Sequence, residues 1–249
     1  MQQRRTSPYP AEAPAWMVGD RPARVLDLGT GRGGLAGMLL QAGHQVCCLD
    51  RSEPAVRRLG ERFATPLVVG QVESLPFLSC HFDVVTAAQT LHHFAPGLAL
   101  SEIARVLRPG GRLAALYVTR DDTVPWVQRL AALLQKYDPG AMAGDYGADS
   151  ITWITDSPYF GEPARRNFRN WVPATRDDLR AMVRRRPATA QLPEPEREQL
   201  LAQVDELYAS VARPPEPLML PYQISCWRAV VDHSQLSPTD SDDGLRIRI

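Results

Sequence analysis

A glycine-rich segment at residues 25–34, VLDLGTGRGG, constrains the fold of this chain more than any other feature. An apolar run leads to Asp27, four glycines follow, and an alanine- and leucine-rich stretch of helical character comes next. Glycine is needed where a turn is tight and a ligand approaches the backbone closely. The order predicts the strand, turn and helix of a nucleotide-binding unit.

A second acidic residue, Asp50, ends the next apolar segment, HQVCCLD. It lies 50 − 29 = 21 residues after Gly29. A carboxylate at the end of a second strand can accept hydrogen bonds from both hydroxyls of a ribose. The two segments together predict an adenosine-containing cofactor.

The glycines fit two different cofactor patterns. Gly29, Gly31 and Gly34 match the dinucleotide fingerprint G-x-G-x-x-G. Residues 27–33 also match D-x-G-x-G-x-G, the first motif of methyltransferases that use S-adenosylmethionine (SAM). A dinucleotide places its pyrophosphate at the helix N-terminus, where Asp27 would repel it. SAM has no phosphate and carries a sulfonium and an ammonium, so the pattern favours SAM.

Three further segments follow in order: GQVESLPF from residue 70, FDVVTAAQTLHHF from residue 82 and LRPGGRLAAL from residue 107. With these segments the chain resembles class I SAM-dependent methyltransferases of the ubiquinone/menaquinone-biosynthesis-like type (methyltransferase type 11), over roughly residues 20–120. The resemblance implies an α/β, Rossmann-like, doubly wound sheet of seven strands. Its last strand is antiparallel, and a helical insertion lies between strands six and seven.

The resemblance also implies which residues contact SAM. The glycine-rich loop would hold the methionine part, the end of strand two the ribose, and the segment before Leu-Pro-Phe the adenine, while the residue after strand four would lie by the methionine carboxylate. For the methionine part the implied residues are Asp27, Gly29, Thr30 and Gly31, and for the ribose Asp50, with Arg51 beside the adenine. For the adenine they are Gln71, Val72 and Glu73, and by the methionine carboxylate Ala88 or Gln89. The family usually has Asp where this chain has Gln71. An amide oxygen still accepts from the adenine amino group.

The candidate catalytic residues are His92 and His93, just after strand four. Methyl transfer requires alignment of the nucleophile, and a base only when the nucleophile arrives protonated. Two interpretations stay open. Either one histidine faces the substrate, or the LHHF segment has only a structural role, since it resembles a structural feature that recurs in the family. Arg120 leaves strand five at the same edge, where it would pair with a substrate carboxylate or be solvated at the surface.

Composition excludes some partners. The chain has 28 basic and 28 acidic residues, so no excess charge draws it to nucleic acid or to anionic membranes. It has no run of about 18 apolar residues and no signal-peptide pattern. Its four cysteines show no C-x-x-C spacing. We therefore expect a cytoplasmic protein with a small-molecule acceptor, no metal and no disulfide framework, as a monomer or homodimer.

The predicted organisation is an arm at 1–21, a methyltransferase domain at 22–231 and a disordered tail at 232–249. Helices at about 175–211 are expected to cover the substrate together with the arm. Ser52 is a predicted N-cap, and Thr175 with Asp178 a capping box. The remaining elements follow from apolar periodicity and turn residues. Strands are predicted at 23–28, 45–50, 66–70, 82–88, 112–118, 160–172 and 219–231, and helices at 32–43, 53–63, 97–107, 124–136, 175–186 and 196–211, with a loop at 137–150.

The expected function is methyl transfer from SAM to a small molecule by in-line displacement. A NAD-dependent oxidoreductase keeps the glycines but does not account for GQVESLPF followed by LRPGG. A nucleic-acid amino-methyltransferase would have an Asn/Asp-Pro-Pro-aromatic motif where residues 87–90 read AAQT. A non-catalytic SAM-binding module stays open as an alternative.

Overall fold

The computed structural model describes residues 9–142, 148–213 and 217–236. These residues form two compact units. The larger unit contains residues 9–117, 148–168 and 224–236, and the smaller unit contains residues 118–142, 169–213 and 217–223. Strands β5 (Leu107–Arg120), β6 (Ala164–Ala174) and β7 (Leu218–Val230) contribute residues to both units.

One sheet of seven strands runs in the order β3-β2-β1-β4-β5-β7-β6. Its other strands are β1 (Arg24–Leu28), β2 (Gln45–Asp50), β3 (Leu67–Val69) and β4 (Phe82–Ala88). Strands β1 to β5 pair in parallel, and β7 is antiparallel. The predicted Rossmann-like fold with a helical insertion between strands six and seven is confirmed. Strand order reverses between β1 and β4, which is where open α/β sheets bind their ligands.

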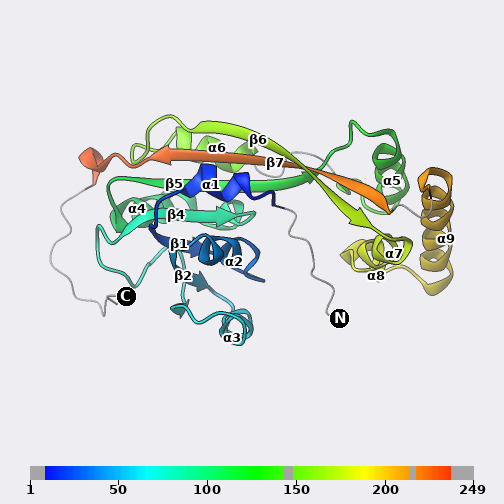
Figure 1. Cartoon of the computed structure of the whole chain (residues 1–249), viewed down its shortest axis with the longest axis horizontal. Helices are drawn as coiled ribbons and strands as arrows, with labels where there is room; N and C mark the ends of the chain where they lie inside the picture. Colours follow the sequence, from blue (N-terminus) through cyan, green and yellow to red (C-terminus); the bar gives the residue numbers. More distant parts are fainter. Residues whose placement is uncertain (1–8, 143–147, 214–216, 237–249) are drawn as a thin grey trace. The chain divides into compact units, whose positions relative to one another are not determined.

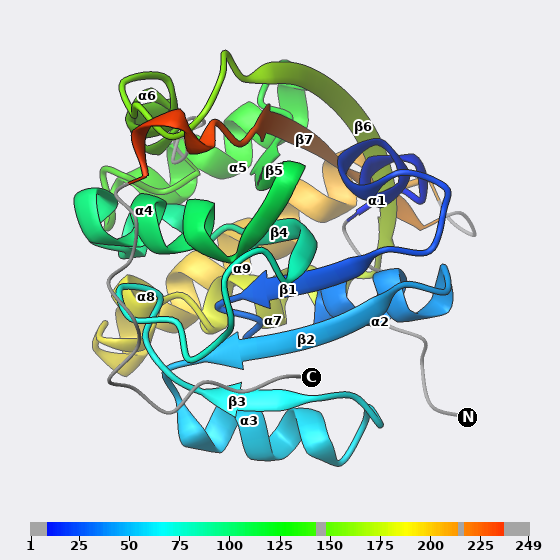
Figure 2. The same ribbon diagram turned by 90° about the vertical axis from the view of Figure 1, so that its left-hand side faces the viewer.

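Helices cover the sheet of the larger unit. They are α1 (Glu12–Val18), α2 (Gly34–Gln41), α3 (Glu53–Gly60), α4 (Pro96–Val106) and α6 (Ala148–Thr155), with 3-10 turns η1 (Leu91–His93) and η2 (His233–Gln235). Figure 2 shows β1, β2 and β3 side by side, with α3 along β3. The predicted cap of α3 is confirmed, because the Ser52 hydroxyl accepts a hydrogen bond from the Ala55 amide (3.4 Å).

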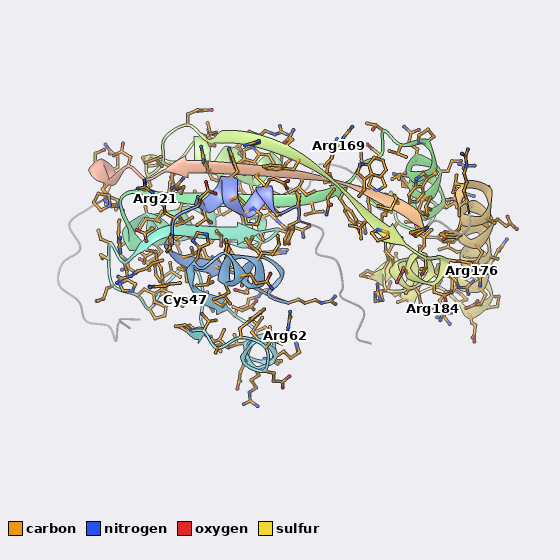
Figure 3. The ribbon with its side chains drawn as sticks, viewed as in Figure 1. Arg21, Cys47, Arg62, Arg169, Arg176 and Arg184 are labelled. Atoms are coloured by element: carbon orange, nitrogen blue, oxygen red, sulfur yellow. The ribbon has the colours of Figure 1, made fainter. Side chains whose placement is uncertain are left out.

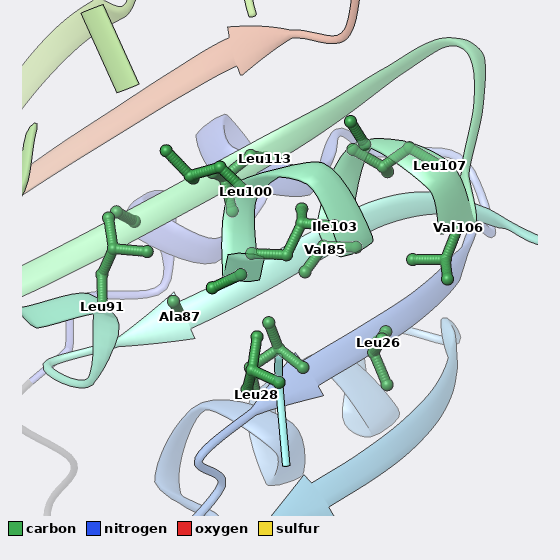
Figure 4. Close-up of a cluster of buried hydrophobic side chains, with 14 of the residues drawn as sticks. Leu26, Leu28, Val85, Ala87, Leu91, Leu100, Ile103, Val106, Leu107 and Leu113 are labelled. Carbon is green, nitrogen blue, oxygen red and sulfur yellow. The ribbon is translucent and has the colours of Figure 1, made fainter. Parts of the chain in front are cut away.

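The main hydrophobic core lies between α4 and the strands. Leu100 and Ile103 of α4 lie over Val85 and Ala87 of β4, with Leu26 on the adjacent strand (Figure 4). All five side chains are buried. Burying a leucine- or isoleucine-sized side chain contributes about 1.5–3 kcal/mol. This core fixes the carboxyl ends of β1 and β4 relative to each other.

The smaller unit has a core of its own. Helices α5 (Pro125–Gln135), α7 (Arg176–Arg184), α8 (Pro187–Ala190) and α9 (Glu194–Val211) lie together (Figure 1). The capping box at the start of α7 is confirmed, with hydrogen bonds of 3.2 and 3.0 Å between Thr175 and Asp178. Arg184, which projects from α7 in Figure 3, pairs with Glu198 of α9 at 2.9 Å. Arg180 pairs with the same helix through Asp205.

The N-terminal arm predicted at 1–21 contains a helix, α1, at residues 12–18, which the apolar periodicity did not predict. The reason is apolar burial, since Ala13 and Met17 are fully buried one turn apart. The Arg228 guanidinium also donates to the Trp16 carbonyl (2.8 Å) and stacks on the Trp16 ring (4.5 Å). The first eight residues lie outside the described part of the chain.

The predicted disorder of the tail at 232–249 is wrong over residues 232–236. Asp232 Oδ1 accepts from the Ser234 amide (2.9 Å), and His233 Nε2 lies 3.0 Å from the Ala104 carbonyl oxygen. The first contact caps η2, and the second holds η2 against α4. Residues 237–249 lie outside the described part.

The predicted loop at 137–150 also ends early, because α6 begins at Ala148. Ile151 and Ile154 of this helix are buried in the main core. Among the helices of the described ranges, none combines the length and the apolar character that crossing a bilayer requires.

Candidate functional site

A cavity of about 370 Å³ lies at the carboxyl ends of β1, β2 and β4, within the larger unit. It is lined by residues from the glycine-rich loop, the end of β2, the segment after β3 and the segment after β4. These residues are Gly29, Leu49, Asp50, Arg51, Gly70, Gln71, Val72, Glu73, Thr90, His93 and Phe94. The structure thus brings together most of the residues that the sequence placed around a cofactor. The volume of the cavity falls within the range of about 300–1,000 Å³ that is usual for ligand pockets.

The glycine-rich loop needs glycine at two positions for different reasons. Gly29 has φ +61°, and a Cβ there would come within 2.8 Å of Thr90 Cγ2. Gly31 has φ +54°, but the nearest atom to a Cβ there would be the Gly29 carbonyl oxygen at 3.8 Å. Gly29 is therefore restricted by its protein neighbour, whereas Gly31 leaves the backbone open to a ligand.

Asp50 ties this loop to the end of β2. Its Oδ2 accepts a hydrogen bond from the Gly31 amide (2.9 Å), and its Oδ1 accepts one from the Ser52 amide (2.9 Å). A carboxylate offers about four acceptor sites, so two amides leave capacity for two ligand hydroxyls. Asp50 is buried but borders the cavity. Asp50 therefore holds the loop in place and still has acceptor capacity on the cavity side.

Asp27 lies beneath the loop rather than on the cavity wall. Its side chain is only 2% exposed, and its Oδ1 accepts a hydrogen bond from Thr86 Oγ1 (2.7 Å). The pKa of Asp27 is raised to about 6, mainly by burial; the hydrogen bonds with Thr86 and Thr30 lower it, and the nearby charge of Asp50 raises it. Thr30 donates its hydroxyl to the Asp27 carbonyl (2.9 Å) and is likewise buried. A cation near Asp27 would favour its ionised form.

The segment that carries Gln71, Val72 and Glu73 is fixed by the helix behind it. Glu73 Oε1 accepts a hydrogen bond from the Ala95 amide at the start of α4 (2.8 Å). Val72 is buried, while Gln71 is exposed at the cavity rim.

A buried arginine holds the next part of the same segment. Arg105 of α4 donates to the carbonyls of Leu75 (2.9 Å) and Phe77 (2.8 Å), and Glu102 accepts from the Leu75 amide (2.7 Å). Sequence reasoning missed Arg105, because an arginine near a helix end is usually solvated. Its position three residues after Glu102 was the available signal.

The two histidines occupy different surroundings. His93 borders the cavity, whereas His92 Nδ1 lies 3.4 Å from the Tyr117 hydroxyl. That hydroxyl is in turn 2.6 Å from Ser150 Oγ, and both Tyr117 and Ser150 are buried. Burial, together with the charge of neighbouring His93, lowers the pKa of His92. His93 is therefore the histidine available to a ligand in the cavity.

The segment after β4 borders the cavity through Thr90 and Phe94. Ala88 and Gln89, one of which is predicted to lie by the methionine carboxylate of SAM, are not among the residues that line this cavity. Thr90 Oγ1 donates to the Leu28 carbonyl (3.0 Å), which turns the threonine toward Gly29. Gln89 has φ +59°, a conformation that non-glycine residues rarely adopt. Such strain is typical of ligand-binding segments.

Comparison with known proteins agrees with this arrangement. Residues 26–115 match the family described as methyltransferase domain. The chain is 39% identical over 129 residues to an uncharacterized methyltransferase of Mycobacterium tuberculosis (strain H37Rv), covering 51% of this chain and 52% of the relative. It is 41% identical over 113 residues to the demethylmenaquinone methyltransferase of Beutenbergia cavernae, covering 44% and 45%. The matches thus span about half the length of these curated relatives.

A solved structure shares the fold over most of the chain. The proposed type II methyltransferase of Anaeromyxobacter dehalogenans superposes with a TM-score of 0.66 and 23% identity, covering 89% of this chain and 96% of its own. The region that matches the methyltransferase domain, residues 26–115, contains the glycine-rich loop and Asp50, and it ends within β5. The resemblance noted in the sequence is confirmed, since residues 26–115 match the methyltransferase domain.

Proposed function

We propose that this protein is an enzyme that transfers the methyl group of SAM to a small-molecule acceptor by in-line displacement. The observation that carries the proposal is the single cavity lined by Gly29 of the glycine-rich loop, Asp50 and the segment Gln71–Glu73. The match of residues 26–115 to the methyltransferase domain supports the use of SAM, and the residues present fit this cofactor.

Each part of SAM has a suitable partner at the cavity or in the glycine-rich loop beside it. The free acceptor sites of Asp50 suit the ribose hydroxyls, and buried Val72 offers an apolar surface to the adenine. The Gln71 amide suits the adenine amino group. The open backbone at Gly31 admits the methionine part, whose ammonium would favour the carboxylate form of Asp27. When bound, SAM supplies an electrophilic methyl group on a good leaving group.

The protein itself has to align the acceptor, exclude water and hold any proton that is released. His93 borders the cavity and is our candidate base for an acceptor that arrives protonated. His92 is turned toward Tyr117, so we assign it to the positioning of its neighbour. The His92 and His93 rings lie 3.9 Å apart between centroids, close enough for one to fix the other.

Calorimetric titration separates the candidate classes. We expect S-adenosylhomocysteine (SAH), the demethylated product of SAM, to bind at one site per chain, and NAD to give no heat. A metabolite extract incubated with methyl-labelled SAM should yield a labelled product. NAD binding without SAH binding would overturn the proposal in favour of an oxidoreductase. SAH binding with no labelled product from any extract would favour a non-catalytic module.

A further inference from the structure

Two buried hydroxyl groups of the larger unit lie behind the histidine pair. Tyr117 of β5 is 3% exposed, and Ser150, in the first turn of α6, is fully buried. Their oxygens lie 2.6 Å apart, and the Tyr117 oxygen lies 3.4 Å from Nδ1 of His92. Because buried polar groups are costly unless they are hydrogen-bonded, each proton of this network needs a defined acceptor.

The Tyr117 oxygen accepts two hydrogen bonds. Burial raises the pKa of Tyr117, whereas hydrogen bonds from the Ser150 hydroxyl and from the His92 backbone amide lower it. Both groups act as donors, because a donor to the phenolic oxygen stabilises its charged form. The proton of the Tyr117 hydroxyl then goes to His92 Nδ1, since an imidazole nitrogen is basic and an alcohol oxygen is not. Tyr117 thus contacts both the main chain and the ring of His92.

These contacts select one form of the His92 ring. When Nδ1 accepts from Tyr117, the single proton of the neutral imidazole lies on Nε2. A proton on Nδ1 would face the phenolic proton and break that hydrogen bond. Burial, together with the charge of neighbouring His93, also lowers the pKa of His92. Its hydrogen bond and its surroundings therefore both favour a neutral His92.

His93 is placed differently. It is exposed and borders the cavity, and its backbone amide donates to the Thr90 carbonyl (2.9 Å). Its ring centroid lies 3.9 Å from that of His92, so two protonated rings would repel each other strongly. The stacked pair therefore holds one proton at a time, and solvation favours that proton on the exposed ring.

The other titratable groups around the pair act in the same direction. Asp50, Arg51 and Glu73 line the same cavity as His93, which gives two carboxylates against one guanidinium. Asp149 precedes Ser150 on α6 and is exposed. An excess of negative charge in the cavity favours a proton on the histidine that shares it.

We propose that Tyr117 is a positioning residue of the methyl-transfer site: its hydroxyl holds His92 in the neutral Nε2–H form, and the pair takes up its proton at His93. The inference rests on the proposed function, in which His93 is the base. As the acceptor atom bonds to the methyl carbon, the bond from that carbon to sulfur breaks with its electron pair on sulfur. The proton of the acceptor passes to a ring nitrogen of His93, and from there to solvent.

Nuclear magnetic resonance of the ligand-free protein tests this arrangement. Spectra of isotope-labelled histidine report the tautomer and the protonation of each ring, and His92→Gln and His93→Gln identify the two signals. We expect His92 in the Nε2–H form and His93 to gain its proton at a higher pH than His92. Tyr117→Phe should give a mixture of His92 tautomers and raise the pH at which His92 titrates. An Nδ1–H form of His92 in the wild type, or first protonation at His92, would overturn the inference.

Two further variants separate positioning from stability. Ser150→Ala removes one donor from Tyr117 but leaves the contacts between Tyr117 and His92, so the Nε2–H form should persist. Tyr159→Phe removes the hydroxyl of another tyrosine that packs against the main core, and it should change neither histidine. Equal loss of the Nε2–H form in Ser150→Ala and Tyr117→Phe would assign Tyr117 a purely structural role.

The rate of methyl transfer gives a second readout. With a metabolite extract and saturating methyl-labelled SAM, we expect Tyr117→Phe to lower the rate of labelling about tenfold. SAH affinity should stay unchanged in this variant, and Tyr159→Phe should keep the wild-type rate. An unchanged rate in folded Tyr117→Phe would overturn the positioning role and leave the methyltransferase function standing. Absence of label with the wild type would instead contradict the proposed function, while the spectra still decide the form of His92.

Discussion

The carboxylate of Asp50 lies 2.9 Å from the backbone amide of Gly31, so the end of β2 holds the loop that follows β1. The loop conformation and the candidate ribose site therefore depend on the same side chain. Loss of this carboxylate is expected to affect the shape of the loop as well as direct contact with the cofactor.

Asp50→Asn and Asp50→Ala are expected to weaken SAH binding by about 1.5–3 kcal/mol, the scale of hydrogen bonds to a charged group. In Asp50→Asn, the new amide group also faces a backbone donor, either at Gly31 or at Ser52. Titration calorimetry measures the loss. Asp20→Asn removes an exposed carboxylate and should leave SAH affinity unchanged. Wild-type affinity in a folded Asp50→Ala protein would remove this residue from the cofactor site.

Alanine at the two loop glycines should destabilise the protein to different degrees. Gly31→Ala places a Cβ in open space, so we expect a loss of about 1–2 kcal/mol in stability from the left-handed backbone, and loss of SAH binding. Gly29→Ala brings a Cβ against Thr90 and should destabilise the fold more strongly. Chemical denaturation and calorimetry measure both effects. Normal SAH binding by Gly31→Ala would place the cofactor elsewhere.

The sequence predicted the sheet and the loop because both depend on local patterns. Glycine spacing, an acidic residue at a strand end and alternating strands and helices are visible without tertiary information. Asp50, for example, was assigned to the cavity edge from its position alone, and it lies there.

The rest of the site depends on contacts between segments far apart in the chain. Thr86 reaches Asp27 only because β4 pairs with β1, and Arg105 reaches Leu75 only once α4 packs on the sheet. The short helices α1 and α6 were missed for the same reason. Seven- and eight-residue helices are marginal alone and form because their apolar residues are buried by the fold.

SAM affinity should depend on pH through Asp27. Its pKa in the folded protein, about 6, is raised above the ordinary value of 3.8, mainly by burial. Its contribution to stability is therefore fully present below about pH 4 and is lost as the pH rises through about 6. A cationic ligand favours the carboxylate and releases the proton on binding. We expect SAM affinity to rise about tenfold between about pH 5 and about pH 7.

The variant Asp27→Asn isolates this effect, because an amide does not titrate in that range. Calorimetry at several pH values should show a flat profile for the variant. Binding of SAM in buffers with different ionisation enthalpies would reveal the released proton. A profile as steep in Asp27→Asn as in the wild type would assign the proton to another group.

The hydrogen bond between Tyr117 and Ser150 should be a measurable part of the larger unit's stability. Tyr117→Phe removes the hydroxyl that lies 2.6 Å from buried Ser150 Oγ, and we expect a loss of about 1–2 kcal/mol in the free energy of unfolding. Ser150→Ala should cost a similar amount. The double variant should cost less than the sum, with a coupling of about 1 kcal/mol. Additive losses would show that the two hydroxyls do not interact.

The sequence-based expectation that the helices at about 175–211 and the N-terminal arm cover the substrate has its own test. Hydrogen exchange of the protein with and without SAH should show protection gained in either segment, because lids come from the less stable parts of a fold. Deletion of residues 1–21 removes α1 as well, so it should lower both turnover and stability. Protection confined to the glycine-rich loop and the end of β2 would instead favour an oligomer-interface role for these segments.

The position of β7 between β5 and β6 has a consequence for synthesis on the ribosome. The loops of the candidate cofactor site lie in the first half of the chain, yet β5 keeps an open hydrogen-bonding edge until residues 218–230 have left the exit tunnel. An unpaired edge of this kind is prone to pairing with other chains. Neither compact unit is a continuous stretch of sequence, so neither is obtained by simple truncation. A nascent chain that stalls within the inserted helices would hence present this edge to chaperones, and aggregation in cells should increase steeply for truncations that end before β7.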